Sequence, residues 1–189
     1  MRSPSVGPVS TPSAARDGQR ARVYRAEDAW AARLDAARRG AALATIGGSS
    51  LLLPSERRLG SLESAADYCE RVLTLPEVVA VAGVLPPPAL RTRRGARVAH
   101  WEPPGVIALP VPIHGEPWAL RETMLLHELA HHVAELGGLA RAHRPPFPAV
   151  LLLLVHAVLG EQAAFALRVD YGGERVQVGR LDPRQEGTR

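Results

Sequence analysis

Two histidines and a glutamate lie close together near the middle of the second half of the chain, in the pattern His127-Glu128-Leu-Ala-His131. Residues four apart lie on one face of an α-helix, so both imidazoles can point at the same metal ion. Glu128 lies about 100° around the helix from His127, where its carboxylate can reach a metal-bound water. Zinc lowers the pKa of such a water to about 7, and a carboxylate can accept its proton as the water attacks a carbonyl. The pattern indicates metal-assisted hydrolysis with Glu128 as general base.

The residues around the motif favour this interpretation over a chance occurrence. Residues 118–133 are mostly apolar, and Leu120 and Met124 lead into His127 at helical spacing. A buried polar group without a hydrogen-bond partner costs about 1–3 kcal/mol, and a bound metal removes that cost. We therefore expect His127 and His131 to bind one zinc ion from a buried helix.

A catalytic zinc site takes a third protein ligand, and the turn after the helix offers one. Gly137 and Gly138 are expected to end the helix, so that the chain turns back and brings His143 to the metal. Glu161, from a later helix, is the alternative third ligand. Glu135 is expected to overshoot the ion. The glycine at position 137 excludes the metzincin pattern, which requires a histidine there.

The other histidines are expected to have supporting or structural roles. His132 points about 100° away from His131, which predicts a position at the surface or behind the ligands. His100 and His114 lie in a stretch expected to form strands and loops. We interpret them as ordinary residues of that region, because three better ligands already complete a catalytic site.

At these residues the chain resembles small metallohydrolases described from actinobacteria. More distantly, it resembles the SprT-like zinc metallopeptidases, whose pattern joins HExxH to a later His-Gly-x-x-Phe. The first resemblance extends from about residue 16 to about residue 178 and includes residues 53–60, 117–122 and 163–171, whereas the second covers only the metal region. The resemblance implies three zinc ligands and a base, at His127, His131, His143 and Glu128. Arg144 replaces the glycine of the pattern, so the local turn is expected to differ. Phe147 keeps the aromatic position and is expected to pack behind the ligand helix.

The composition bears on domain number and partners. The chain has 189 residues, of which 46% are hydrophobic, and this suits one domain with a single core. All 23 basic residues are arginine and asparagine is absent, a bias that a GC-rich genome produces. The net charge is only +4, and no arginines alternate with aromatic residues. We therefore interpret the basic character as a solvated surface rather than a nucleic-acid interface.

The cysteine content and the first residues bear on the compartment. The single Cys69 cannot form a disulfide within the chain, which suits a reducing compartment, and its helical surroundings favour core packing over catalysis. Residues 1–20 lack the apolar centre of a signal peptide. No apolar run reaches the roughly 20 residues that span a bilayer. We expect a soluble cytoplasmic protein that does not associate with membranes.

The expected fold is α+β and zincin-like, with a small antiparallel sheet packed on a helical bundle whose central helix carries the motif. Residues 16–180 are expected to form this single domain, between a disordered tail at 1–15 and a mobile tail at 181–189. Apart from the motif helix, helices are predicted over residues 20–39, 61–73, 147–159 and 161–169. Strands are predicted over residues 50–54 and, as a hairpin, over 96–101 and 106–109. Residues 168–178 are expected to form a closing strand or hairpin, in which Tyr171 is a candidate oxyanion donor and Asp170 a candidate partner of a ligand imidazole.

Two functions are compatible with these residues. The first is a zinc-dependent hydrolase that cleaves peptide or amide bonds in a peptide or protein substrate. The second is a non-catalytic module in which zinc is structural and arginine-rich surfaces bind a partner such as DNA. A closed fourth coordination position would favour the second function, and an open one would favour the first.

Overall fold

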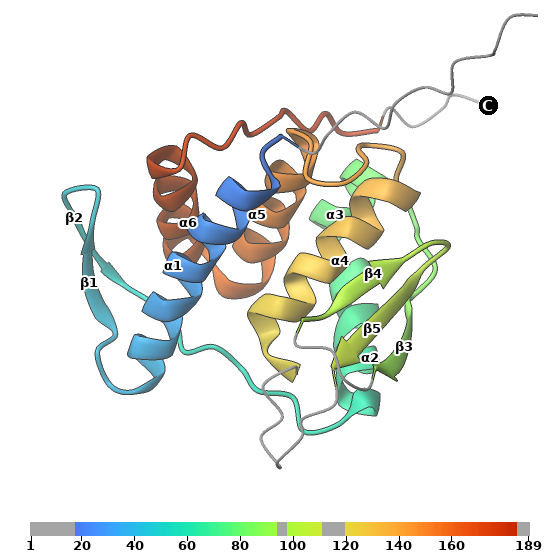
Figure 1. Cartoon of the computed structure of the whole chain (residues 1–189), viewed down its shortest axis with the longest axis horizontal. Coiled ribbons are helices and arrows are strands. Elements are labelled where there is room, and N and C mark those ends of the chain that lie inside the picture. Colours follow the sequence, from blue (N-terminus) through green and yellow to red (C-terminus); the bar gives the residue numbers. More distant parts are fainter. Residues whose placement is uncertain (1–17, 94–97, 111–119, 185–189) are drawn as a thin grey trace, which may run out of the picture.

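A computed structural model describes residues 18–93, 98–110 and 120–184 of the chain (Figure 1). The helices within these residues are α1 (Arg20–Arg38), α2 (Leu62–Leu73), α3 (Pro76–Ala82), α4 (Glu122–Leu136), α5 (Pro146–Leu159) and α6 (Glu161–Gly173). The strands are β1 (Leu43–Ile46), β2 (Ser49–Leu52), β3 (Ala89–Arg93), β4 (His100–Glu102) and β5 (Val106–Pro110). Helices and small sheets occur together, which confirms the predicted α+β class.

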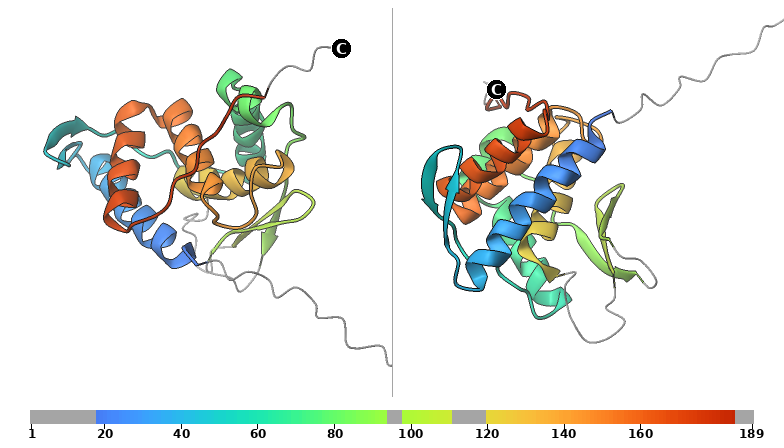
Figure 2. Two further views of the ribbon diagram at one scale, coloured as in Figure 1. Left: turned by 90° about the horizontal axis from the view of Figure 1, so that it is seen from above. Right: turned by 60° about the vertical axis from the view of Figure 1, so that its left-hand side comes forward.

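Four helices pack in succession and form much of the core. α1 lies against α6, α6 against α5 and α5 against α4, as Figures 1 and 2 show. The other side of α4 faces α2 and β4. The pattern His127-Glu128-Leu-Ala-His131 therefore lies on a helix that is covered on both sides. Apolar side chains fix this helix in place, and six of them are fully buried: Leu125, Leu126, Leu129, Ala130, Val133 and Ala134.

Helix α1 forms where the apolar spacing predicts it. Its buried residues recur every three or four positions and face α6: Val23, Ala26, Trp30, Leu34 and Ala37. The indole Nε1 of Trp30 donates a hydrogen bond to the carbonyl of Ala163 at 3.0 Å, which fixes α1 against α6. The predicted helix after Ser61 is also confirmed, because the Ser61 and Ser64 side chains form a capping box at the start of α2.

The N-terminus of α4 is capped by Glu56, which lies outside the helix and accepts a hydrogen bond from the backbone N of Thr123 at 3.4 Å. Arg121, at the N-cap position, provides no side-chain cap. Glu56 instead accepts hydrogen bonds from the Thr123 hydroxyl at 2.5 Å and from the Arg121 guanidinium at 2.8–3.0 Å. Glu122 is fully buried and accepts hydrogen bonds from Tyr68 Oη and from the backbone N of Arg57, each at 3.0 Å. Negative charge at this end of the helix also complements its dipole.

The three-stranded sheet is mixed, and the prediction of an antiparallel sheet is wrong in this respect. β4 and β5 form the predicted antiparallel hairpin, with Trp101 opposite Ile107. β3 pairs with the other edge of β5 and runs parallel to it, with Leu90 opposite Ile107. The reason is topological, because β4 reverses the chain between β3 and β5 and so gives those two strands the same direction. β1 and β2 form a separate antiparallel pair.

The C-terminal part of the described chain differs from the prediction. Residues 168–178 form no strand, because α6 continues to Gly173 and buries Tyr171 completely. Arg184 then donates hydrogen bonds from its backbone to Ala80 O at 2.8 Å and from its side chain to Gly137 O at 2.6 Å. Residues 181–184, expected to be mobile, therefore contact the domain. The expected tail at 1–15 and the last residues, 185–189, lie outside the described residues.

Candidate metal centre

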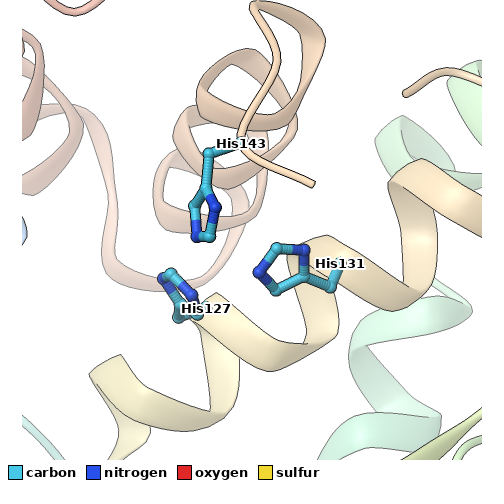
Figure 3. Close-up of side chains that lie close together, drawn as sticks. All are labelled: His127, His131 and His143. Carbon is cyan, nitrogen blue, oxygen red and sulfur yellow. The ribbon is translucent and has the colours of Figure 1, made fainter. Parts of the chain in front are cut away.

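Three histidines from two segments converge on one point. His127 and His131 project from successive turns of α4, and His143 comes from the loop between α4 and α5 (Figure 3). One ring nitrogen of each lies within 4.8 Å of the others. His127 and His143 are buried, while His131 is partly exposed and lines a cleft. The structure thus brings together the three residues that the sequence predicts as ligands.

The loop that carries His143 is held by its neighbours. Gly138 follows α4 with φ of +70°, a left-handed conformation that glycine adopts easily. Ala142 also has a positive φ, of 52°, which for a residue with a side chain costs about 1–2 kcal/mol. Its backbone N donates to Glu135 Oε1 at 3.5 Å, and the carbonyl of His143 accepts from Gln19 Nε2 at 2.5 Å. The loop therefore adopts an unfavourable backbone conformation at Ala142, and this conformation places the imidazole of His143 beside the other two.

Phe147 supports all three imidazoles from behind. Its ring centroid lies 4.3 Å from that of His131, 4.8 Å from that of His143 and 5.1 Å from that of His127. The predicted packing of Phe147 behind the ligand helix is therefore confirmed. Arg144, which stands where the resembling pattern has glycine, is exposed, and the left-handed residue of this loop is Ala142 instead.

A carboxylate that the sequence analysis missed orients the first ligand. Glu27 on α1 lies with Oε2 at 2.6 Å from Nδ1 of His127, and Tyr171 on α6 donates its hydroxyl to Glu27 Oε1 at 2.9 Å. This contact places the Nδ1 proton toward Glu27 and leaves Nε2 to face the other histidines. Nε2 of His127 is buried and has no hydrogen-bond partner among the described residues. An unpartnered buried nitrogen beside two more imidazoles fits a bound metal ion.

The two ligands on α4 differ in their protonation. Burial disfavours a charged imidazole at His127, but the carboxylate of Glu27 outweighs this and raises the pKa of His127 to about 9. Burial lowers the pKa of His131 to about 2, and the neighbouring imidazoles and the charge of Arg20 act in the same direction. His131 is therefore neutral and ready to donate its lone pair.

Glu128 lies beside the three histidines and faces the cleft. It is 5% exposed and lines cavities on both sides of the site. Burial raises the pKa of Glu128, although His127 and a hydrogen bond from the backbone of Trp101 oppose the shift. A carboxylate with a raised pKa is a stronger base near neutral pH, so this environment suits a residue that accepts a proton.

Tyr24 is a second cleft residue that the sequence analysis did not single out. Its ring stacks on His127, with centroids 5.2 Å apart and planes 24° apart, and its centroid is 5.2 Å from that of His143. Burial and the carboxylate of Glu128 raise the pKa of Tyr24, so its hydroxyl keeps its proton. Tyr171, the predicted oxyanion donor, is instead fully buried and bound to Glu27, so that prediction is wrong.

Two further candidates, Glu161 and Asp170, take no part in the histidine cluster. Glu161, the alternative third ligand, is exposed at the start of α6 and is not part of the histidine cluster. Asp170 forms an ion pair with Arg33 at 2.8 Å, so it orients no ligand imidazole and that prediction is wrong. His100 is exposed at the edge of the cleft. His114 lies outside the described residues.

His132 is fully buried, so of its two expected positions, at the surface or behind the ligands, the surface position is wrong. Its Nδ1 accepts a hydrogen bond from Trp101 Nε1 at 3.3 Å, and its Nε2 lies 2.8 Å from the carbonyl of Pro86. Gly105 makes room for this ring, because a Cβ there would lie 3.1 Å from Cε1 of His132. His132 therefore fastens α4 to the sheet, on the side of the helix away from the metal ligands.

One feature of the sequence could have indicated that Glu27 and Tyr24 belong to the site. They lie three residues apart on α1, next to a buried stripe that contains Val23, Ala26 and Trp30. A carboxylate and a phenol beside an apolar stripe require polar partners across the interface. The identity of those partners depends on how α1 packs against α4 and α6, which spacing along the chain does not encode.

Comparison with known proteins identifies no relative. No protein-family model matches the chain, and no curated protein or solved structure matches it either. Within the described residues, none of the helices combines the length and the apolar composition needed to cross a bilayer.

Proposed function

We propose that this protein is a zinc-dependent hydrolase of peptide or amide bonds, with a zincin-like centre in which His127, His131 and His143 hold the metal. One observation carries the proposal: three ligating nitrogens lie within 4.8 Å of one another, and Nε2 of His127 is buried without a described hydrogen-bond partner. Three imidazoles are a common protein ligand set for catalytic zinc. When bound there, zinc supplies a Lewis acid and a water of lowered pKa.

The residues around the metal position have separate roles in this proposal. Glu128 accepts a proton from the attacking water and returns it to the leaving amine. Tyr24 donates its hydroxyl to the carbonyl oxygen as negative charge develops there. Glu27 keeps the ring of His127 in one orientation, and Tyr171 keeps Glu27 in place.

The surroundings of the histidines favour catalysis over a purely structural metal. Structural zinc sites are closed by four protein ligands, whereas catalytic sites keep a position open. A cavity of ≈ 690 Å³ is lined by Glu128, His131 and His143. A substrate could therefore approach both the metal position and the proposed base from the same side.

The order of the ligands supports a relationship to the families that the chain resembles. The third histidine follows HExxH after a glycine turn, and Phe147 packs against the imidazoles as an aromatic at that position would. We infer that the chain shares the arrangement of the actinobacterial metallohydrolases and, over the metal region, that of the SprT-like metallopeptidases.

The proposal is tested by separating metal binding from catalysis. The Glu128→Gln variant should retain one zinc per chain but lose about 10²–10⁴-fold in hydrolysis of a peptide library, because the base is removed while the ligands remain. His143→Ala should lose the zinc. The measurements are elemental analysis of the purified protein and an assay with and without a chelator.

A matched control distinguishes the two candidates for the third ligand. Glu161→Gln makes the same chemical change as Glu128→Gln on the exposed start of α6. It should leave both zinc content and hydrolysis unchanged. Hydrolysis that persists undiminished in Glu128→Gln would refute the role of the base, and a protein that binds no zinc would refute the metal centre.

A further inference from the structure

The cleft continues on both sides of the proposed base. A wide arm of ≈ 690 Å³ and a narrow arm of ≈ 300 Å³ share four lining residues: Tyr24, Val98, Ala99 and Glu128. Since Glu128 belongs to both arms, a substrate that passes the metal position places one flank in each arm. The chemistry of each arm then determines what the corresponding flank can carry.

The wide arm is lined by three arginines. Arg20 comes from α1, whereas Arg91 and Arg93 come from β3. The guanidinium of Arg91 is already bound to Glu102, at 2.6 Å. Arg20 and Arg93 form no ion pair with any side chain in the described part of the chain. These two cations are therefore available to a ligand.

Arg20 also lies near the catalytic groups. Its guanidinium carbon is 5.4 Å from the centre of the Tyr24 ring, and that ring stacks on His127. The guanidinium also forms a hydrogen bond with the Tyr24 side chain, which acts to lower the pKa of Tyr24. The cation–π contact and this bond hold the guanidinium in place, and its other N–H groups can bind a ligand. Arg20 can therefore contact a group that is bound close to the metal position.

The acidic residues of the wide arm have other partners or another proposed role. Glu102 is the partner of Arg91, and Glu135 accepts the backbone N–H of Ala142 in the loop of His143. The third, Glu128, is the proposed base. None of these carboxylates is within ion-pairing distance of Arg20 or Arg93 in the described structure, although the charge of Arg93 adds to that of Arg91 in lowering the pKa of Glu102.

The narrow arm has the opposite character. Its lining includes the carboxylates of Glu27 and Asp28 and the apolar side chains of Trp30, Ala31 and Met124. Its one arginine, Arg121, is bound to Glu56 through both Nε and Nη2. Of the arginines that line the two arms, the unpaired ones therefore lie in the wide arm.

We propose that Arg20 and Arg93 form an anion subsite that binds a carboxylate of the substrate, on one flank of the bond that is cleaved. This inference rests on the proposed function. Guanidinium groups bind carboxylates through paired N–H donors, with more geometric specificity than a lysine would give. The narrow arm, with its acidic and apolar lining, accepts a neutral or apolar flank.

A carboxylate fits the wide arm better than a nucleic acid does. A polyanion requires an extended surface of one sign, so that many phosphates are contacted. The lining of the wide arm instead combines Arg20, Arg91 and Arg93 with Glu102 and Glu135, and these carboxylates would repel phosphates. A single anionic group needs only Arg20 and Arg93, the two arginines of this arm that form no ion pair in the described structure.

The subsite is tested with small zinc-binding probes rather than with turnover. Monohydroxamates of short dicarboxylic acids carry a chelating group at one end and a carboxylate at the other, and the matched primary amides lack only the charge. On the zinc-loaded protein, the carboxylate probe should bind about tenfold more tightly than its amide, as expected for charge-assisted hydrogen bonds at an exposed site. This preference should decline as salt is added.

Charge-removing variants locate the preference. Arg20→Gln and Arg93→Gln should each bring the ratio of the two dissociation constants toward one while the amide probe binds as before. Arg71→Gln removes an exposed arginine at the end of α2, outside both arms, and should leave the ratio unchanged. Two alanine peptides then distinguish the kinds of carboxylate. One carries its carboxylate at the C-terminus and the other on a Glu side chain, and each is compared with the corresponding amide to show which carboxylate is bound.

The outcomes separate this inference from the proposed function. If zinc and the amide probe bind but the carboxylate adds nothing, the anion subsite is overturned and the metal centre stands. If neither zinc nor any hydroxamate binds, the proposed function falls and the subsite falls with it. If Arg20→Gln and Arg93→Gln lower the affinity for an oligonucleotide instead, the wide arm is a nucleic-acid surface and the carboxylate proposal is wrong.

Discussion

At the scale of single residues, the proposed metal centre depends on hydrogen bonds that begin two helices away from α4. Tyr171 on α6 holds Glu27 on α1, and Glu27 holds His127 on α4. Each hydrogen bond restricts the rotation of a side chain before any metal binds. Without these bonds, that freedom would be lost only on metal binding. The conformational entropy of the ligand is therefore lost during folding, and less is lost on binding.

Replacing Glu27 should weaken zinc binding without removing a ligand. The Glu27→Gln variant loses the negative charge beside His127 Nδ1, and we expect the zinc dissociation constant to rise about 10–100-fold. Tyr171→Phe removes only the bond to Glu27 and should have a smaller effect in the same direction. Both are measured by competition with a chelator of known affinity.

Asp28→Asn is the matched control for Glu27, because it removes a neighbouring carboxylate of α1 that is exposed and makes no described contact with a ligand. Its zinc affinity should equal that of the unmodified protein. Equal affinities for Glu27→Gln and Asp28→Asn would show that Glu27 does not position the metal ligand.

The residues of the site could be predicted from the sequence only in part. His127, Glu128 and His131 follow from helical spacing, which is local, and His143 follows from the glycine turn after α4. Glu27 acts across the interface of α1 with α4, and Tyr24 reaches the cleft by stacking on a ligand. Contacts of this kind arise from tertiary packing, so no spacing rule along the chain identifies them.

At the scale of secondary-structure elements, the position of α4 depends on the carboxylate cap at its first turn. Glu56 is buried, and it accepts hydrogen bonds from the side chains of Arg121 and Thr123. The helix that carries two metal ligands is thereby joined to the segment that precedes α2. A loss of this cap would affect the whole ligand helix, because α4 has no side-chain cap of its own.

Glu56→Gln should destabilise the fold by about 2–3 kcal/mol, because the partly buried Arg121 is left without its counter-ion. The free energy of unfolding in urea measures the loss. Glu70→Gln, an exposed position on α2, should change it by less than about 0.5 kcal/mol. A Glu56 variant as stable as the Glu70 variant would contradict the role assigned to the cap.

The elements also show where pattern analysis succeeds and where it fails. The helices over residues 20–38 and 62–73 follow from apolar periodicity and, for α2, from a serine cap. β3 was not predicted, because its sequence Ala-Leu-Arg-Thr-Arg exposes four of five residues and carries little apolar signal. α6 was predicted too short, since residues 168–178 were expected to form a strand or hairpin, but the buried Tyr171 continues its apolar face.

At the scale of the whole molecule, the side chains of the tyrosines and the cysteine are buried or partly buried. The chain has three tyrosines and one cysteine. Burial raises the pKa of Tyr24, Tyr68 and Tyr171, and it raises the pKa of Cys69 to about 12. In each case the folded state holds the proton more tightly than the unfolded state does. The corresponding stability is complete below about pH 9 and is lost as the pH rises further.

We therefore expect the free energy of unfolding to fall between about pH 9 and pH 12. Ionisation of tyrosine is followed by its absorbance at alkaline pH. In concentrated urea the midpoint of ionisation should lie near the usual value of about 10, whereas in the folded protein it should lie above that value. A folded protein whose tyrosines all ionise near pH 10 would contradict the burial that the structure assigns to them.

The contacts that hold the loop of His143 have a consequence for the synthesis of the protein. The amide of Gln19 contacts both the carbonyl of His143, at 2.5 Å, and the backbone of Gln177. Gly179 also donates its backbone N–H to Pro145, next to the same loop. A nascent chain on the ribosome thus presents the ligand pair of α4 well before residues 177–179 can secure the loop. If the proposed centre holds an ion, we expect tight binding only after translation has passed residue 179.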